Sequence, residues 1–252
     1  MAQRIAVIGS GNVATHLARA LKGVVQIYSR NIDNARQLAS EIGCDATDSL
    51  QNLAEADVYI VSVKDDAISG IAANAPERCL SGLWLHTSGS VDKSVFASRM
   101  LRYGVMYPLQ TFSKNVAVKM DEVPLFIEGS SDGVEAEIRQ LAAIVSPTVY
   151  HADSRIRMQM HIAAVFACNF SNYMYTLSDE VLSANNLPFS VLRPLLEETL
   201  RKACSNAPGQ SQTGPAARGD NGILSKHEAL LSGEAKEIYK TVSNAILKRY
   251  NQ

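Results

Sequence analysis

The sequence GSGNVATHLARAL at residues 9–21 decides the fold of this chain. It follows the apolar run IAVI at residues 5–8 and opens an amphipathic stretch, so the pattern predicts a strand, a glycine-rich turn and a helix. Gly9, Gly11 and Ala14 occupy the small positions of the dinucleotide-binding fingerprint G-x-G-x-x-G/A. The helix N-terminus would offer free N–H groups to a pyrophosphate. A glycine turn without a ligand is the alternative.

The residues after the second expected strand, at residues 24–28, indicate which dinucleotide binds. An acidic residue there would accept hydrogen bonds from the ribose 2′-hydroxyl of NAD and repel the 2′-phosphate of NADP. This chain has Ser29, Arg30 and Asn31 instead, and a guanidinium pairs with a phosphate. We therefore predict NADP(H), with a solvated surface arginine as the alternative for Arg30. Asp33, the nearest acid, is expected to begin the next helix.

Composition excludes several classes of partner. The 252 residues carry a net charge of −1, which gives no electrostatic case for nucleic acid or an anionic membrane. No apolar run is long enough to span a bilayer, and the N-terminus enters a strand directly, which predicts no signal peptide. The four cysteines lie far apart, so reduced thiols in the cytoplasm are expected. No cluster of residues has the spacing of metal ligands.

The order of elements predicts two domains. Strands and helices alternate over residues 1–152, which predicts an α/β domain with a doubly wound, mostly parallel Rossmann sheet. Asp153 resembles a helix N-cap, and residues 153–252 are expected to form an all-α domain for substrate binding or dimerisation. Its expected helices cover residues 154–184, 188–205 and 233–250, with a long loop at 206–221. We expect the substrate to bind between the domains, at the carboxyl ends of the strands.

Two polar groups follow expected strands. The first is HTSGS at residues 86–90, in which Ser88 could position a reacting atom; a turn whose serines cap the next helix is the alternative. The second is YPLQTF at residues 107–112, in which Tyr107 and Gln110 could bind substrate. Packing at the domain junction is the alternative for Tyr107.

The first long helix carries three polar residues beside an apolar segment. Residues 162–168 are apolar all round, which predicts that this helix is buried. At 100° per residue, His161, Asn169 and Asn172 share one arc. They either satisfy one another or line a polar cleft. We expect His161 to donate or accept a proton, because an unperturbed imidazole titrates near neutral pH.

The long loop contains the sequence GPAARGD at residues 214–220. Arg218 stands between small residues, which suits binding of a substrate carboxylate or phosphate. Asp220 could orient Arg218 or His227. A solvated linker is the alternative.

The expected site residues fall into three groups. The catalytic group is His161, Asn169 and Ser88. The substrate-binding group is Tyr107, Gln110, Asn172, Arg218 and Asp220. The cofactor-binding group lies on the glycine-rich turn and at strand ends: Gly9, Ser10, Gly11, Asn12, Val13, Ser29, Arg30, Asn31, Val63, Lys64, His86 and Thr87.

These motifs carry a family resemblance over nearly the whole chain. The chain resembles bacterial NADP oxidoreductases in which an NADP-binding domain precedes a helical domain, and residues 214–220 are the most distinctive mark. Its N-terminal half also looks like pyrroline-5-carboxylate reductase, prephenate dehydrogenase and deazaflavin-dependent NADP oxidoreductase. The resemblance implies hydride transfer and frequent dimers. Such sequences tend to have His where this chain has Tyr107. The β-hydroxyacid dehydrogenase branch uses a lysine on the first inter-domain helix, and residues 154–184 contain none.

The sequence therefore predicts a homodimeric NADP(H)-dependent oxidoreductase. It would transfer a hydride between nicotinamide and a small, anionic C=O or C=N substrate held by Arg218. A non-catalytic NADP(H) sensor or interaction module is the first alternative. A reductase that uses a deazaflavin as second carrier is the other.

Overall fold

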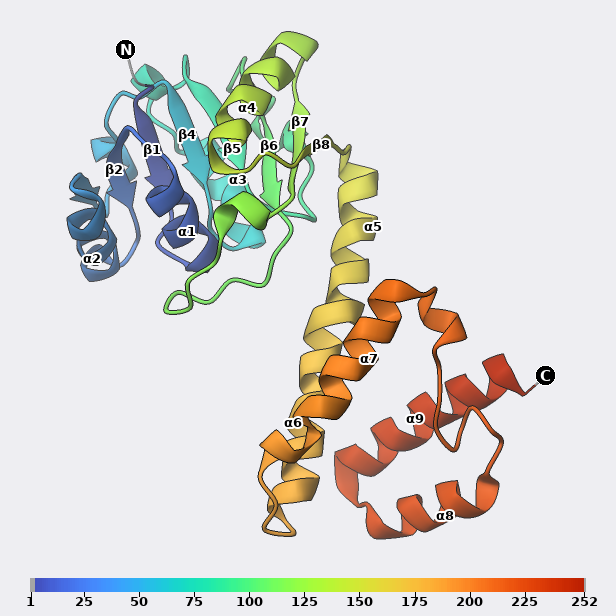
Figure 1. The fold of residues 1–252 in the computed structure, drawn as a ribbon. Helices are drawn as coiled ribbons and strands as arrows, with labels where there is room; N and C mark the ends of the chain where they lie inside the picture. Colours follow the sequence, from blue (N-terminus) through green and yellow to red (C-terminus); the bar gives the residue numbers. More distant parts are fainter. Residues whose placement is uncertain (1–2, 252) are drawn as a thin grey trace. The chain divides into compact units, whose positions relative to one another are not determined.

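The computed structural model describes residues 3–251, which fold into two compact units, Met1–Asn169 and Phe170–Gln252. The change from strands to helices expected at Asp153 is present, because the last strand ends at His151 and a helix begins at Ser154. The compact units divide later, since this first helix belongs to the unit that holds the sheet. Figure 1 colours the chain along its sequence.

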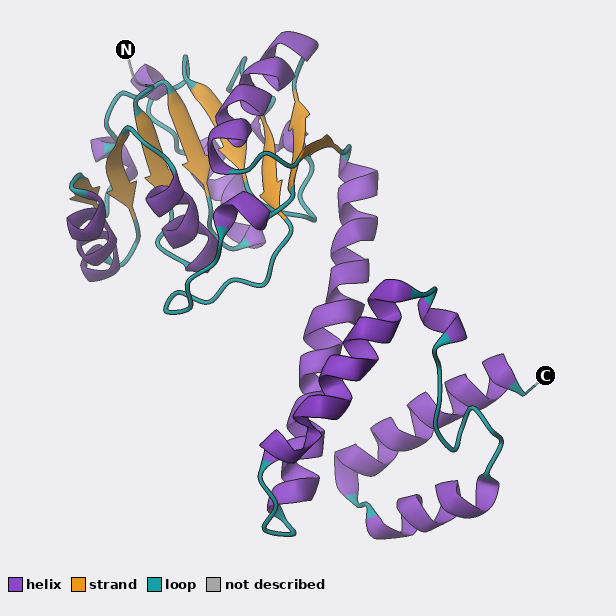
Figure 2. Ribbon diagram, in the orientation of Figure 1, coloured by secondary structure: helices purple, strands orange, loops and turns teal. Residues whose placement is uncertain are grey.

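The first unit is built on one sheet, which has eight strands among the described residues and is drawn in orange in Figure 2. Their order is β3-β2-β1-β4-β5-β6-β7-β8, and each neighbouring pair is parallel except β6 and β7. The predicted Rossmann-like fold class is confirmed. The strands are β1 (Ile5–Ile8), β2 (Val24–Tyr28), β3 (Asp45–Thr47), β4 (Val58–Val61), β5 (Leu83–His86), β6 (Tyr103–Pro108), β7 (Leu125–Gly129) and β8 (Val149–His151).

Helices cover both faces of the sheet. One core packs α1 (Asn12–Ala20), α2 (Ile32–Ile42) and α4 (Asp132–Val145) against one face. The other core packs α3 (Asp65–Ala73) and the short helix Lys93–Phe96 against the opposite face. In this second core the Trp84 ring stacks on Tyr59 with 4.5 Å between the ring centroids. Both faces of the central strands are thus buried, as their apolar sequences require.

The second unit is helical and contains one helix that the pattern did not predict. Its helices are α6 (Ser171–Ser183), α7 (Arg193–Ser205), α8 (Asn221–Leu230) and α9 (Gly233–Tyr250). The unpredicted helix is α8, which begins directly after the N-cap Asp220. The expected helix over residues 154–184 is also interrupted, because a π-helix at Val165–Phe170 separates α5 (Ser154–Ala164) from α6.

The expectation that residues 162–168 are buried is wrong for the single chain. Ile162 is 43% exposed, Phe166 is 65% exposed, and Cys168 is exposed. An apolar sequence indicates that a helix gains by being covered, but it does not say that the same chain covers it. Within residues 170–251 only three residues are buried, namely Ala216, Leu224 and Ser243. Among the helices described, none combines the length and apolarity that crossing a bilayer requires.

Candidate dinucleotide and proton-transfer site

The glycine-rich turn between β1 and α1 has the form that a pyrophosphate needs. Gly9 has a φ of 132°, and a Cβ there would lie 2.0 Å from the carbonyl oxygen of Ser62 at the end of β4. Gly11 is the N-cap of α1, makes no side-chain cap, and leaves open space where a Cβ would project. The first N–H groups of α1 therefore face an open cradle. These residues fit a dinucleotide phosphate.

The ribose side of the site lies at the end of β2. The Ser10 hydroxyl donates to the Ser29 hydroxyl over 2.9 Å, which joins the glycine turn to the residue before Arg30. Arg30 itself is exposed. The side-chain oxygen of Asn31 accepts hydrogen bonds from the backbone N–H groups of Asp33 and Asn34, so it caps α2. Its predicted role at the cofactor therefore rests on its amide N–H₂ group, and the role of Arg30 at the phosphate stays a prediction.

The loop after β6 folds back onto α1. The Asn12 side-chain amide donates to the Phe112 carbonyl over 2.8 Å, and the His16 ring N–H donates to the Ser113 carbonyl over 3.1 Å. The predicted motif at residues 107–112 is thus brought beside the glycine turn. Gln110 is exposed, and its side-chain oxygen accepts from the Thr111 N–H. Val13, the next residue of α1, is half-buried.

His86 and Ser88 hold the turn that follows β5. The Ser88 N–H donates to His86 Nδ1 over 3.2 Å, and the Ser88 hydroxyl oxygen accepts from the N–H groups of Ser90 and Val91. The His86 side chain has no exposed surface and supports the turn from inside, and its role at the cofactor stays a prediction. Burial, and next the positive charge of Arg157, lower the pKa of His86 to about 4. His86 is therefore neutral at pH 7.

Hydroxyl groups join this turn to the end of β4. The Thr87 hydroxyl donates to the Ser62 hydroxyl over 3.1 Å, and the Ser90 hydroxyl donates to the Asp65 carboxylate. Val63 is half-buried and Lys64 is exposed at the N-cap of α3. Because β1, β4, β5 and β6 are parallel, all these residues lie at one edge of the sheet.

Tyr107 and His161 meet at the same edge. The Tyr107 hydroxyl and His161 Nδ1 are hydrogen-bonded over 3.2 Å, and their rings meet edge to face with 6.2 Å between centroids. Tyr107 is 8% exposed, and burial raises the pKa of its phenol, although the nearby Arg157 charge opposes the shift. A Cβ at Gly89 would lie 2.9 Å from the Tyr107 ring, so this ring crosses the turn where only a glycine fits. The result is a buried phenol that is hydrogen-bonded to the imidazole of an exposed histidine.

The predicted arc of His161, Asn169 and Asn172 does not form as calculated. The π-helix at Val165–Phe170 has a wider turn than an α-helix, so the 100° step fails between His161 and Asn172. Asn169 is exposed in the π-helix, and Asn172 is exposed on α6 in the second unit. The structure thus joins His161 to Tyr107, a pairing that the sequence pattern did not identify.

The loop at residues 214–220 belongs to the second unit. Arg218 is exposed. Asp220 accepts a hydrogen bond from the Ile223 N–H over 3.3 Å, so its carboxylate caps α8. Among the described residues neither side chain forms an ion pair, and the substrate role of both remains a prediction.

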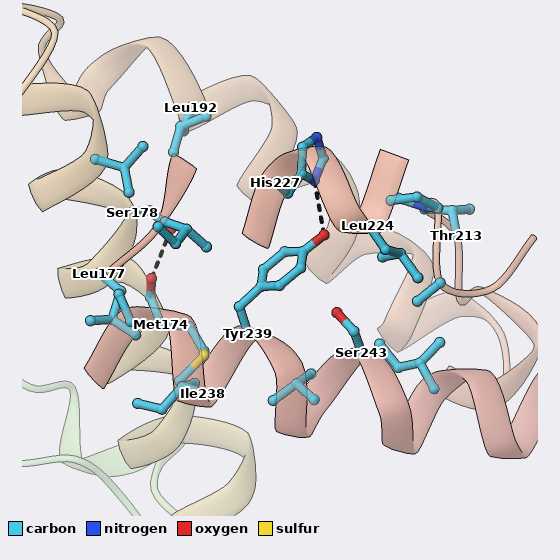
Figure 3. A pocket seen from close by; sticks show the side chains of 18 of the residues that line it. Met174, Leu177, Ser178, Leu192, Thr213, Leu224, His227, Ile238, Tyr239 and Ser243 are labelled. Carbon is cyan, nitrogen blue, oxygen red and sulfur yellow. Dashed lines mark hydrogen bonds between the residues drawn. The ribbon is translucent and has the colours of Figure 1, made fainter. Parts of the chain in front are cut away.

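An apolar cavity of about 580 Å³ opens beside this loop in the second unit (Figure 3). His227 Nδ1 and the Tyr239 hydroxyl are hydrogen-bonded over 2.8 Å within its wall. The rest of the wall is largely aliphatic and comes from α6, α8 and α9, with Met174, Leu177, Leu224, Ile238, Val242 and Ile246 as examples.

The architecture and the edge site define a Rossmann-type dinucleotide-binding protein with a helical second unit, and known proteins agree. Residues 4–83 match the family described as NADP oxidoreductase, coenzyme F420-dependent, and residues 123–246 match a domain of unknown function, DUF2520. A protein from Bacteroides fragilis, assigned as an NADP oxidoreductase, is 41% identical, with 98% of each chain covered and a TM-score of 0.90. No curated protein matches the chain significantly in sequence.

Two more distant structures share the fold. A reductive aminase from Aspergillus terreus, in complex with NADPH and ethyl-5-oxohexanoate, is 14% identical over 98% of this chain and 94% of that chain, with a TM-score of 0.72. An imine reductase from Myxococcus stipitatus, in complex with NADP⁺, is 14% identical over 97% and 92%, with a TM-score of 0.67.

The chain belongs to the NADP oxidoreductase family of the Bacteroides fragilis protein. This membership confirms the predicted family and the predicted cofactor, NADP(H).

Replacing Arg30 tests the assignment of the 2′-phosphate. We expect Arg30→Ala to weaken NADPH binding by roughly 10- to 100-fold and to leave NADH binding unchanged, because a charge-assisted hydrogen bond is worth about 1.5–3 kcal/mol. Titrations followed by nicotinamide fluorescence measure both affinities. Arg36→Ala, which removes another exposed arginine from α2, is the control. An unchanged NADPH preference in Arg30→Ala contradicts the assignment.

The buried His86 makes stability depend on pH. Its pKa is about 4 in the folded chain against an ordinary value of 6.5, so the unfolded chain takes up a proton first as the pH falls. The free energy of unfolding therefore contains the whole contribution of His86 above pH 6.5. This contribution declines toward pH 4, by up to about 3 kcal/mol. Urea unfolding midpoints measured across this window should vary less in His86→Asn. The control His151→Gln changes an exposed histidine and should leave the pH dependence of the unfolding midpoint unchanged. If His86→Asn also leaves this pH dependence unchanged, His86 is not its source.

Proposed function

We propose that this protein is an NADP(H)-dependent oxidoreductase that transfers a hydride between nicotinamide and a small C=O or C=N substrate. The observation that carries the proposal is the hydrogen bond between Tyr107 and His161 at the edge that also holds the glycine turn. Bound NADPH supplies the hydride. Addition of a hydride to C=O or C=N leaves negative charge on the oxygen or nitrogen, so the product also needs a proton.

Tyr107 and His161 can supply that proton together. The Tyr107 hydroxyl donates to the substrate atom and recovers a proton from His161, whose exposed ring exchanges protons with solvent. The raised pKa of Tyr107 keeps the phenol protonated before the reaction. In the reverse direction the same pair accepts the proton.

The remaining site residues are proposed to hold and orient the substrate. Gln110 lies near the glycine turn, and Asn169 follows His161 on the π-helix. Ser88 contributes by fixing the turn under Tyr107 rather than by chemistry of its own. Arg218 would bind an anionic group, and Asn172 and Asp220, which belong to the same unit, would contribute polar groups to substrate binding. The keto ester bound to the Aspergillus terreus reductive aminase, and the imine reductase activity that names the Myxococcus stipitatus protein, support a carbonyl or imine substrate class.

A second candidate function has a specific observation behind it. Residues 4–83 match the family described as coenzyme F420-dependent, which favours a deazaflavin as the hydride partner of NADP(H). The same protein assayed with NADPH and a deazaflavin, without any carbonyl or imine, distinguishes this function from the first.

We also propose that the protein is a homodimer. In the described part of the second unit only three residues are buried, while ten large apolar side chains are exposed, including Leu195 at 61% and Leu200 at 66% on α7. A unit with so small a core does not offset its ordering entropy alone. A second copy of this chain would cover these side chains and the cavity of Figure 3.

The free cysteines, two of them exposed, suit a reducing compartment such as the cytoplasm.

Conservative changes at Tyr107 and His161 test the proton-transfer pair. We expect Tyr107→Phe and His161→Gln each to lower the turnover number by about 100-fold or more with little change in NADPH affinity, because general acid catalysis contributes about 10²–10⁴-fold. Turnover is measured on a panel of small imines and keto acids by loss of NADPH absorbance.

Tyr150→Phe, at an exposed tyrosine on β8, is the control. Equal losses of NADPH affinity and turnover in the site variants would indicate a structural role. If the unaltered protein binds NADPH but turns over no substrate, the proposal that it is an oxidoreductase is rejected and a non-catalytic NADP(H) sensor is favoured.

Sedimentation velocity tests the dimer. The protein is expected to sediment with twice the 27.3 kDa mass of one chain at micromolar concentration. Leu195→Glu should shift it toward the monomer, because a charge on α7 opposes burial of that face. Leu101→Glu, at a leucine of the first unit that is 91% exposed, should leave the mass unchanged. A monomeric unaltered protein rejects the proposal.

A further inference from the structure

Arg157 on α5 is the most deeply buried charge of the described chain. Its side chain has no exposed surface, and it stands four residues before His161, one helical turn away. A guanidinium stays charged in proteins, and a buried charge is tolerated only when it is paired and hydrogen-bonded. The proton-transfer chemistry proposed above does not use it.

Three segments converge on this side chain. Arg157 donates to the Glu128 carboxylate on β7 over 2.6 Å, to the Ala152 carbonyl before α5 over 3.1 Å, and to the Val91 carbonyl after β5 over 2.8 Å. Lys93 binds the other oxygen of Glu128 over 2.8 Å. Two terminal nitrogens of one guanidinium therefore tie α5 to β7 and to the turn that contains Gly89.

The register of the sheet relates this cluster to the proton-transfer pair. Glu128 pairs with Val105 across β6 and β7, and Tyr107 lies two residues farther along β6, on the same face. Two residues along a strand span about 6.6 Å, and four residues along a helix span about 6 Å. The Arg157–Glu128 and His161–Tyr107 hydrogen bonds thus connect α5 to the same face of the sheet at two successive positions.

We propose that Arg157 is a positioning residue. It fixes how α5 is rotated about its axis and how far it is displaced along that axis, and so places His161 against Tyr107. Through the Val91 carbonyl it also fixes the turn on which the Tyr107 ring rests. Only an arginine can donate to all three acceptors, because its planar guanidinium spreads its N–H donors over separate nitrogens. A lysine has a single ammonium nitrogen and cannot reach the three acceptors at once. The effect on catalysis rests on the proposed function, but the effect on the Tyr107–His161 hydrogen bond does not.

The substitution Arg157→Lys in the full-length protein tests this inference, with Arg155→Lys as the matched control. Arg155 is on the same helix, two residues away, and exposed. The first readout is the side-chain ¹⁵N spectrum of His161 in protein labelled at histidine, with His161→Gln to assign the signal. In the unaltered protein and in Arg155→Lys, the His161 signals should move when Tyr107 is replaced by Phe. In Arg157→Lys they should already stand at the position of Tyr107→Phe.

The second readout is turnover. We expect Arg157→Lys to lower the turnover number by about 100-fold, as a misplacement of about 1 Å does, with NADPH affinity within about twofold. The double variant Arg157→Lys/Tyr107→Phe should lose no more than Tyr107→Phe alone, because both changes remove one interaction. Losses that multiply, or His161 signals that remain as in the unaltered protein, overturn the inference.

Glu128→Gln is a milder second variant if Arg157→Lys does not fold. The amide keeps an oxygen acceptor for Arg157 but removes its charge, so the same shift of the His161 signals is expected in part. Unchanged His161 signals in Glu128→Gln also contradict the inference. If the unaltered protein has no turnover, the proposed function fails, while the spectra still decide the positioning role.

Discussion

The parallel pairing of β1, β4, β5 and β6 is the constraint on which the rest of the site depends. It brings four strand ends to one edge, so the glycine turn, the hydroxyl pair of Thr87 and Ser62, and Tyr107 become neighbours although they are far apart in the sequence. The pairing is tight. Gly9, which has no Cβ, lies against the Ser62 carbonyl, and any larger residue would push β1 and β4 apart beside the glycine turn.

Beneath this edge the structure uses buried polar groups as fixed supports. His86, uncharged, accepts from the Ser88 N–H, Ser88 in turn accepts from Val91, and the Val91 carbonyl accepts from Arg157. The proximity of the Arg157 charge also favours the neutral imidazole. A continuous set of hydrogen bonds thus runs from the end of β5 to the first turn of α5, although His86 Nε2 and Arg157 Nε, both buried, have no hydrogen-bond partner of their own in the described part of the chain.

The sequence predicted the fold well because its signals are local. The strand, turn and helix around Gly9 need only neighbouring residues, and the prediction for Arg30 rests on the fixed spacing of the ribose position from the turn. The site was predicted less well for a physical reason. Asn31, Ser88 and Asp220 have side-chain oxygens that could bind a ligand, but the structure uses them to accept backbone N–H groups.

Other features depend on three-dimensional register, which one sequence does not reveal. The π-helix changes the phase between His161 and Asn172, and most of the apolar segment 162–168 is exposed in the single chain. The importance of Arg157 could have been suspected from its place one turn before His161 in a helix that was expected to be buried. Its partners Glu128 and Val91 could not, because they are 29 and 66 residues away.

The antiparallel strand β7 has an effect on the direction of the chain. Since β8 is parallel to β7, it ends at the sheet edge opposite the glycine turn, so α5 starts there and runs toward the edge where Tyr107 lies. The glycine turn needs only β4 as its neighbour, because Gly9 lies against Ser62. The Tyr107–His161 hydrogen bond also needs the later strands of the sheet and α5. The segments that form the glycine turn and β4 therefore leave the ribosome well before the segments that complete the Tyr107–His161 pair.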